Sequence, residues 1–137
     1  MLRLFCCSVV FLMLIAGCGG ENVGLKGKVT FSDDDSPVTS GTVAFRKDGK
    51  IARGDIKEDG TYVVGFDKVA NGLPPGKYQV FISGAYQVVG RNEAAEEDIL
   101  EPLLDKKYES PETSGLTVEV TASTKVFDIK VDRFKKR

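Results

Sequence analysis

Apolar residues at every second position constrain the fold of this chain more than any other feature of its sequence. Such alternation is typical of strands that bury one face, because successive side chains of a strand point to opposite sides. It recurs in about seven short segments, several of which are separated by turn sequences such as Asp48-Gly49 and Asp59-Gly60. The segments are 23–31, 43–45, 51–56, 61–64, 77–82, 116–120 and 127–131. We therefore predict an all-β fold, a seven-stranded Greek-key β-sandwich, over residues 25–133.

One long connection, residues 85–114, breaks this pattern. Its middle, residues 91–101, carries five acidic residues and one basic residue. A helix of two turns with Asn92 as its N-cap is one interpretation of this stretch, and we otherwise expect an irregular insert. Val88–Leu104 is expected to fold poorly, so that it can be trimmed with little loss of stability. Tyr108–Leu116 runs directly into a predicted strand and is expected to be structural.

Several short motifs follow one another along the chain. They are Gly27-Lys28-Val29, Ser36-Pro37-Val38, Gly41-Thr42-Val43, Glu58-Asp59-Gly60-Thr61-Tyr62 and Pro75-Gly76-Lys77-Tyr78. Their order resembles the carboxypeptidase regulatory-like module, and this implies a transthyretin-like or immunoglobulin-like sandwich. The run 107–118 resembles a subset of bacterial envelope lipoproteins that carry this module. The resemblance implies a non-catalytic accessory or cell-surface domain, because the hydrolases among its transthyretin-like relatives depend on histidines.

The N-terminal residues have the pattern of a lipoprotein signal peptide. Arg3 supplies a positive charge, and residues 4–15 form an apolar run that is too short to span a membrane. The sequence Ile15-Ala16-Gly17-Cys18 resembles the bacterial lipobox, in which a peptidase cuts before a lipid-bearing cysteine. A buried N-terminal helix is the alternative, but the following glycines would end it abruptly.

We therefore predict a signal peptide over 1–17, lipidation of Cys18, and a lipidated tether over 18–24. The membrane is an expected partner through the lipid on Cys18. The expected location is the bacterial cell envelope, outside the cytoplasm, on its periplasmic or surface side. Because Cys18 is the one cysteine left after processing, no disulfide can form within the mature chain.

Histidine is absent from all 137 residues, and this excludes several chemistries. Ser-His-Asp and Cys-His catalysis and histidine-ligated zinc all need an imidazole. The 19 basic and 20 acidic residues create no basic field, so we expect no binding of nucleic acid. No cofactor and no metal site are predicted.

Four charged clusters have both a functional and a plain interpretation. Asp33–Asp35 suggests calcium, but three adjacent carboxylates cannot all point at one ion, and a solvated turn is preferred. The acids of Asp55–Asp59 have the same two interpretations. Glu96 and Glu97 offer paired carboxylates, as in glycosidases, but no predicted apolar pocket surrounds them. The basic tail 134–137, with Arg133 before it, is expected to contact anionic lipid or to be solvated.

Two tyrosines form the candidate binding surface. The chain has four tyrosines and no tryptophan, and Tyr62 and Tyr78 are expected within the core or at strand edges. This leaves Tyr86 and Tyr108 as residues that could present a ring to a sugar. Tyr108 also has a structural interpretation, which we prefer, as the aromatic anchor of the segment before the strand at 116–120.

Together these observations favour a non-enzymatic, lipid-anchored envelope protein whose sandwich is a structural or protein-binding module. Its partner would be an unknown envelope protein or glycan. A carbohydrate-binding or small-ligand-binding module is the alternative, and a divergent hydrolase is the third hypothesis. An exposed shelf of Tyr86 and Tyr108 would favour sugar binding, and a deep pocket with converging acids would favour an enzyme. The absence of both features would favour the first hypothesis. The tripeptide Arg53-Gly54-Asp55 spells an adhesion motif, but it lies in a predicted strand and is attributed to chance.

Overall fold

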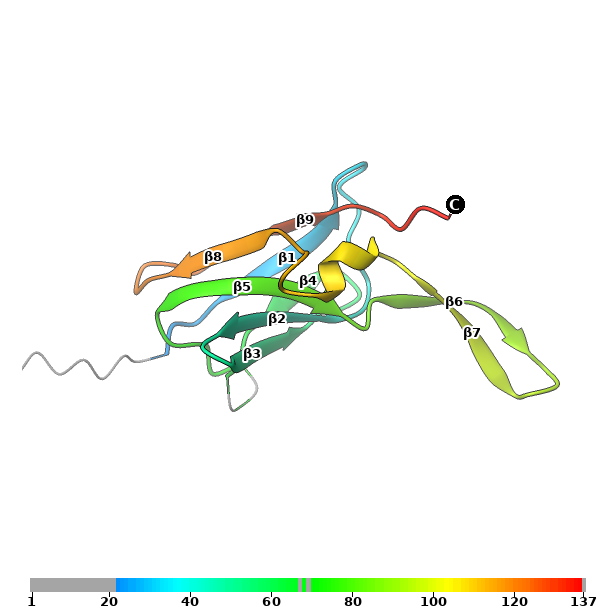
Figure 1. Ribbon diagram of the computed structural model, residues 1–137, viewed down its shortest axis with the longest axis horizontal. Coiled ribbons are helices and arrows are strands. Elements are labelled where there is room, and N and C mark those ends of the chain that lie inside the picture. The colour runs from blue at the N-terminus through cyan, green and yellow to red at the C-terminus, as the bar shows by residue number, and fades with distance from the viewer. Residues whose placement is uncertain (1–21, 67, 69, 137) are drawn as a thin grey trace, which may run out of the picture.

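The computed structural model describes residues 22–66, 68 and 70–136, so the predicted signal peptide and Cys18 lie outside the described residues. This part of the chain forms nine strands and one short 3-10 helix (Figure 1). The strands are β1 (Lys26–Phe31), β2 (Thr42–Lys47), β3 (Lys50–Asp55), β4 (Thr61–Val63), β5 (Gly76–Ser83), β6 (Tyr86–Asn92), β7 (Glu97–Pro102), β8 (Leu116–Val120) and β9 (Ile129–Val131), and the helix is η1 (Lys106–Glu109). Over the same described residues, no helix has the length and apolar character needed to cross a membrane.

Seven of the strands form two sheets that pack face to face. One sheet has the order β4-β1-β9 and the other has the order β3-β2-β5-β8. Only the β1–β9 pair is parallel among these described strands. The chain changes sheet four times, between β1 and β2, β3 and β4, β4 and β5, and β8 and β9, as in Greek-key sandwiches. The predicted seven-stranded β-sandwich is therefore confirmed, and β6 and β7 are two further strands that we did not predict.

Turn chemistry explains two of the connections. Asp48 and Gly49 both have positive φ angles, 50° and 74°, which a two-residue hairpin with the right-handed twist of its strands requires. They join β2 to β3 directly after the Lys47–Lys50 pair. Before β4, the carboxylate of Asp59 accepts hydrogen bonds from the backbone N and the hydroxyl of Thr61, at 3.0 and 2.6 Å. These local contacts set the first residue of each strand.

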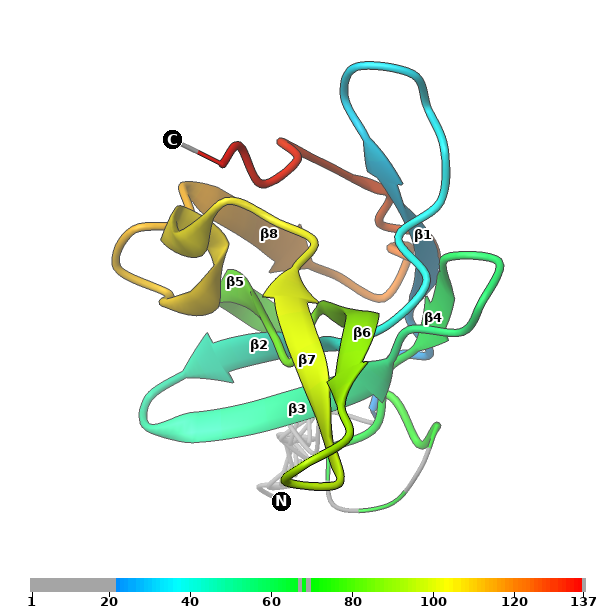
Figure 2. The ribbon, with the colours of Figure 1, turned by 90° about the vertical axis from the view of Figure 1, so that its right-hand side faces the viewer.

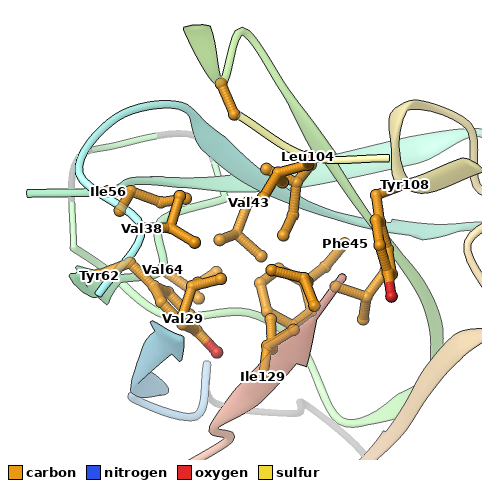
Figure 3. Close-up of a cluster of buried hydrophobic side chains, with 14 of the residues drawn as sticks. Val29, Val38, Val43, Phe45, Ile56, Tyr62, Val64, Leu104, Tyr108 and Ile129 are labelled. Atoms are coloured by element: carbon orange, nitrogen blue, oxygen red, sulfur yellow. The ribbon is translucent and has the colours of Figure 1, made fainter. Parts of the chain in front are cut away.

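The core lies between the two sheets and contains the alternating apolar residues of the sequence. Figure 3 shows Val29 and Ile129 from one sheet pointing toward Val43 and Phe45 from the other. The Phe45 ring is 6.2 Å from the ring of Tyr62, measured between centroids. Every side chain of the buried apolar cluster lies within residues 25–131. The described part of the chain thus builds a complete core of its own, and burial of each large side chain contributes about 1.5–3 kcal/mol.

Tyr62 and Tyr78 are buried, which confirms their predicted place in the core. Their hydroxyls reach backbone carbonyls at the rim: Tyr62 donates to Phe127 O, and Tyr78 donates to Pro74 O at 2.6 Å. Burial raises the pKa of the Tyr62 phenol, because its charged form would lose solvation. Gly27 leaves the space that the Phe127 carbonyl occupies, since a Cβ at this position would collide with it.

The sandwich has two ends that carry different elements (Figure 1). The end where the described chain begins contains the β2–β3 turn, the described residues of the connection 64–75, and the connection 121–128; we call it the N-terminal end. The C-terminal segment and the β6–β7 hairpin lie at the opposite end, as the view in Figure 2 also shows.

Candidate functional site

The most exposed structured element is the hairpin of β6 and β7, which projects beyond the sandwich (Figures 1 and 2). Its strands pair antiparallel from Tyr86 opposite Pro102 to Asn92 opposite Glu97. The Asn92 side chain accepts hydrogen bonds from the backbone N of Ala94 and of Ala95, at 3.1 and 3.3 Å, and so closes the turn. We call residues 86–102 the projecting hairpin.

This hairpin corrects two expectations for the insert. Residues 92–100 do not form a helix: Asn92 caps a turn, and the chain then returns as β7. Residues 85–114 are not irregular either, because the hairpin and η1 occupy most of them. Valine and isoleucine in both halves favour extended backbone, and the ladder of the hairpin satisfies backbone groups that an isolated helical turn would leave free.

Large apolar side chains of the projecting hairpin face solvent. The exposed fractions are 61% for Val88, 52% for Val89, 50% for Ile99 and 58% for Leu100. Val88 lies directly opposite Leu100, so these two side chains share one face. Ile99 must lie on the other face, because neighbouring residues of a strand alternate. Ordinary sheets bury one apolar face, whereas both faces of this hairpin present apolar side chains, and such exposure is characteristic of interaction surfaces.

Acidic residues surround these apolar side chains. The charged residues of the hairpin are Arg91, Glu93, Glu96, Glu97, Asp98 and Glu101, and all but one are acidic. Arg91 and Asp98 face each other across the ladder, with 3.8 Å between their charged atoms. Glu96 and Glu97, considered above as a catalytic pair, lie exposed at the turn of the hairpin. The arrangement suits binding to an apolar surface with a basic rim.

Tyr86 lies at the base of the hairpin with 41% of its surface exposed. Its hydroxyl donates to Glu109 Oε1 at 3.1 Å, and its backbone carbonyl accepts from the Ser40 hydroxyl at 2.8 Å. The hydrogen bond to Glu109 and the charge of that carboxylate raise the pKa of Tyr86. Tyr86 therefore holds the hairpin against the sandwich while one part of its ring remains accessible.

Tyr108, in contrast, is part of the core, with 5% of its surface exposed (Figure 3). Its hydroxyl lies 3.1 Å from a carboxylate oxygen of Asp132, to which it donates, and 3.1 Å from the Asp132 backbone N, from which it accepts. The Lys107 ammonium lies 2.5 Å from the same carboxylate. Hydrogen bonds from Lys107, Ser32 and Tyr108 lower the pKa of Asp132 to about 2. Tyr108 and Tyr86 thus form no shared aromatic shelf, and Tyr108 has the structural role.

The last residues of the segment expected to fold poorly also belong to the sandwich. Leu103 and Leu104 are buried, and the Leu103 backbone N donates to Ala85 O at 2.9 Å. The Leu103 carbonyl also accepts from the backbone N of Phe134 at 2.9 Å, which holds the start of the basic tail against the fold. The part of Val88–Leu104 that we expect to be dispensable therefore ends before these leucines.

The acidic turn considered for calcium forms ion pairs with basic side chains from the C-terminal segment. Arg133 lies 3.2 Å from Asp33 and 3.3 Å from Asp34, and Lys130 lies 2.7 Å from Asp35. These are surface ion pairs of small individual energy. They nevertheless direct the three carboxylates toward two separate cations. Arg133, which the sequence grouped with the basic tail, is held at this turn.

The adhesion tripeptide and the neighbouring acids are structural as well. Gly54 is buried in β3, where a Cβ would contact the Val63 carbonyl at 2.6 Å. Asp55 accepts from the Thr42 hydroxyl at 3.0 Å, across the β2–β3 pair. The Asp59 carboxylate is occupied by Thr61, as described above.

The hollows in the described surface are open grooves. One of them, about 540 Å³, is lined by described residues of β3, β4 and the connections that follow these strands, and Asp55 is the one acid among them. A second, about 480 Å³, adjoins the first described residues and β4. Neither groove shows a pair of carboxylates converging within the described residues.

Comparisons with known proteins address the fold. No known protein family and no curated protein matches the chain. BcpA, the major pilin subunit of Bacillus cereus, is similar in structure at 14% identity over 83% of this chain and 30% of the pilin chain, with a TM-score of 0.50. A 9R-lipoxygenase from Cyanothece is similar at 14% identity over 82% of this chain and 17% of that chain, with a TM-score of 0.41. The chain thus spans about 30% of the length of the pilin, and the likeness shows a common sandwich fold alone.

Proposed function

We propose that this protein is a lipid-anchored, non-catalytic module of the bacterial cell envelope that binds another envelope protein through its projecting hairpin. The observation that carries the proposal is the set of four exposed apolar side chains on both faces of that hairpin. A monomeric surface rarely presents neighbouring valine, isoleucine and leucine side chains to water without a partner that covers them. The motif order that resembles the carboxypeptidase regulatory-like module agrees with an accessory role.

The geometry favours a protein partner over a sugar or a substrate. Sugar binding by stacked rings needs accessible aromatic surface, and Tyr108 is buried beneath its neighbours. Acid–base hydrolysis needs two carboxyl groups that face one site, and neither of the two grooves described above is lined by two carboxylates. The hairpin instead combines an apolar centre, an acidic rim and the outer edges of β6 and β7, which pair with no other described strand. These are features of protein-binding surfaces.

Proposed anchoring at Cys18 would set the orientation of this surface. Cys18 precedes Asn22, the first described residue, by four positions, a span of at most about 14 Å in an extended chain. The N-terminal end of the sandwich would therefore stay close to the membrane. The hairpin lies at the other end and would point away from it (Figure 1).

Site-specific photo-cross-linking in intact cells tests the proposal. A photoreactive residue replaces Val88 or Leu100, and in the control it replaces Thr117, an exposed residue of β8. We expect Val88 and Leu100 to yield the same cross-linked protein, because they are cross-strand neighbours, and Thr117 to yield none of it. A charge at the other face, Ile99→Glu, should reduce that product strongly. Equal products from all three positions, or none from the hairpin, would refute this function.

A further inference from the structure

Six lysines gather at the N-terminal end of the sandwich, although they are spread over 100 positions of the sequence. They are Lys26, Lys47, Lys50, Lys68, Lys77 and Lys125. Strand pairing explains how the fold collects them: Lys47 and Lys50 flank the β2–β3 turn, and Lys26 begins β1, where its backbone N donates to Lys125 O at 3.2 Å. All but Lys47 are exposed.

Few acidic groups accompany these lysines. Asp48, Glu119 and Asp128 are the described acids at this end, and none of the six lysines forms an ion pair with a described residue. The Lys47 ammonium instead donates to the Pro75 carbonyl at 3.2 Å. The acids of the projecting hairpin lie at the opposite end. The molecule is therefore electrically polarised along its length, although its formal net charge is −1.

Apolar side chains lie between the lysines. Val63 pairs with Lys26 on one side of β1, and Val126 bridges to Lys26 on the other, so the three side chains form one row on the outer face of the sheet. Val63 and Val126 are 41% and 55% exposed. The groove of about 480 Å³ runs beside this row, with Lys26 and Lys125 in its lining. Surfaces that lie on a bilayer interface typically combine lysines with exposed apolar side chains in this way.

We propose that this surface, the six lysines with Val63 and Val126, docks onto anionic phospholipid headgroups. The lysines would bind the headgroup phosphates while the two valines rest at the boundary of the acyl region. The place where the chain enters favours a membrane over other polyanions, since Asn22, four residues after Cys18, lines the same groove. The C-terminal tail, the basic segment considered for lipid in the sequence, lies at the other end of the molecule (Figure 1). The biological setting rests on the proposed anchoring, but the docking surface exists without it.

Vesicle co-sedimentation of the chain from residue 19 onward tests this inference without any acyl group, and that chain retains the whole core. We expect binding to phosphatidylglycerol–phosphatidylcholine vesicles, little binding to pure phosphatidylcholine, and release as salt screens the charges. Lys26→Glu/Lys68→Glu/Lys125→Glu should weaken binding about 100-fold or more, at roughly fivefold for each lysine lost.

The matched control, Lys106→Glu/Lys135→Glu/Lys136→Glu, makes the same change in net charge at the opposite end. It should change the affinity less than about threefold, because charges more than a Debye length from the membrane are screened. Unchanged melting temperatures of both variants show that they are folded. Equal losses in the two variants, a larger loss in the control, or displacement by inorganic phosphate at constant ionic strength would overturn the inference. None of these results depends on lipidation of Cys18, so the two proposals can fail separately.

Discussion

At the scale of single residues, Tyr108 joins the long insert to the last strand of the sandwich. Its ring is buried, and its hydroxyl bonds both to the carboxylate and to the backbone N of Asp132. We predict that Tyr108→Ala lowers the free energy of unfolding by about 3–5 kcal/mol, as large-to-small changes of buried aromatic residues do. Tyr108→Phe keeps the ring and should cost about 1–2 kcal/mol for the lost hydrogen bonds. Urea unfolding gives both values, and Tyr86→Ala, at an exposed tyrosine, is the control. A Tyr108→Ala unfolding midpoint equal to that of the wild type would contradict the structural role of Tyr108.

At the scale of elements, the projecting hairpin is separable from the sandwich. The side chains of residues 87–100 are exposed, with Gly90 half-buried, so none of them belongs to the core. Tyr86 and Pro102 face each other across the pair, and a two-residue glycine-containing turn can replace 87–101 between them. We predict that this deletion changes the free energy of unfolding by less than about 1 kcal/mol.

The control for this deletion is one that extends to residue 104. It removes Leu103 and Leu104, whose buried side chains should each cost about 2–5 kcal/mol. Thermal unfolding of both deletions distinguishes the two boundaries. If the shorter deletion unfolds the domain as the longer one does, the hairpin is part of the folding unit.

At the scale of the whole molecule, we predict that Cys18→Ala moves the protein from the membrane fraction to the soluble fraction. Each methylene group that an acyl chain buries in the bilayer contributes about 0.8 kcal/mol to membrane binding. Surface lysines cannot replace this binding energy in high salt, because salt screens their charges. Fractionation after a high-salt wash, together with labelling by palmitate, measures the change. Cys7→Ala is the control, because the predicted cleavage removes this residue. A Cys18→Ala protein that remains in salt-washed membranes would exclude anchoring by this cysteine.

The seven strands of the sandwich could be predicted from the sequence, because strand alternation and turn chemistry are local properties. Val29 and Phe31 alternate with polar residues whatever lies elsewhere in the chain, and Asp48-Gly49 can adopt its turn without tertiary contacts. The burial of Tyr62 and Tyr78 followed from the same periodicity. The projecting hairpin could not be read in this way: Val88-Val89 and Ile99-Leu100 are adjacent apolar pairs, so they show no period of two.

Only the tertiary structure decided which distant residues meet. Tyr108 became a core residue because β9 places Asp132 beside it, 24 positions later in the chain. Arg133 pairs with Asp33 and Asp34 across 100 and 99 positions, since β1 and β9 are parallel neighbours. The six lysines of the N-terminal end form no cluster in sequence order, where acidic residues separate all but Lys68 and Lys77. A sequence pattern reports what each residue can bury locally, whereas charge polarity and long-range hydrogen bonds arise only when the sheets bring the strand ends together.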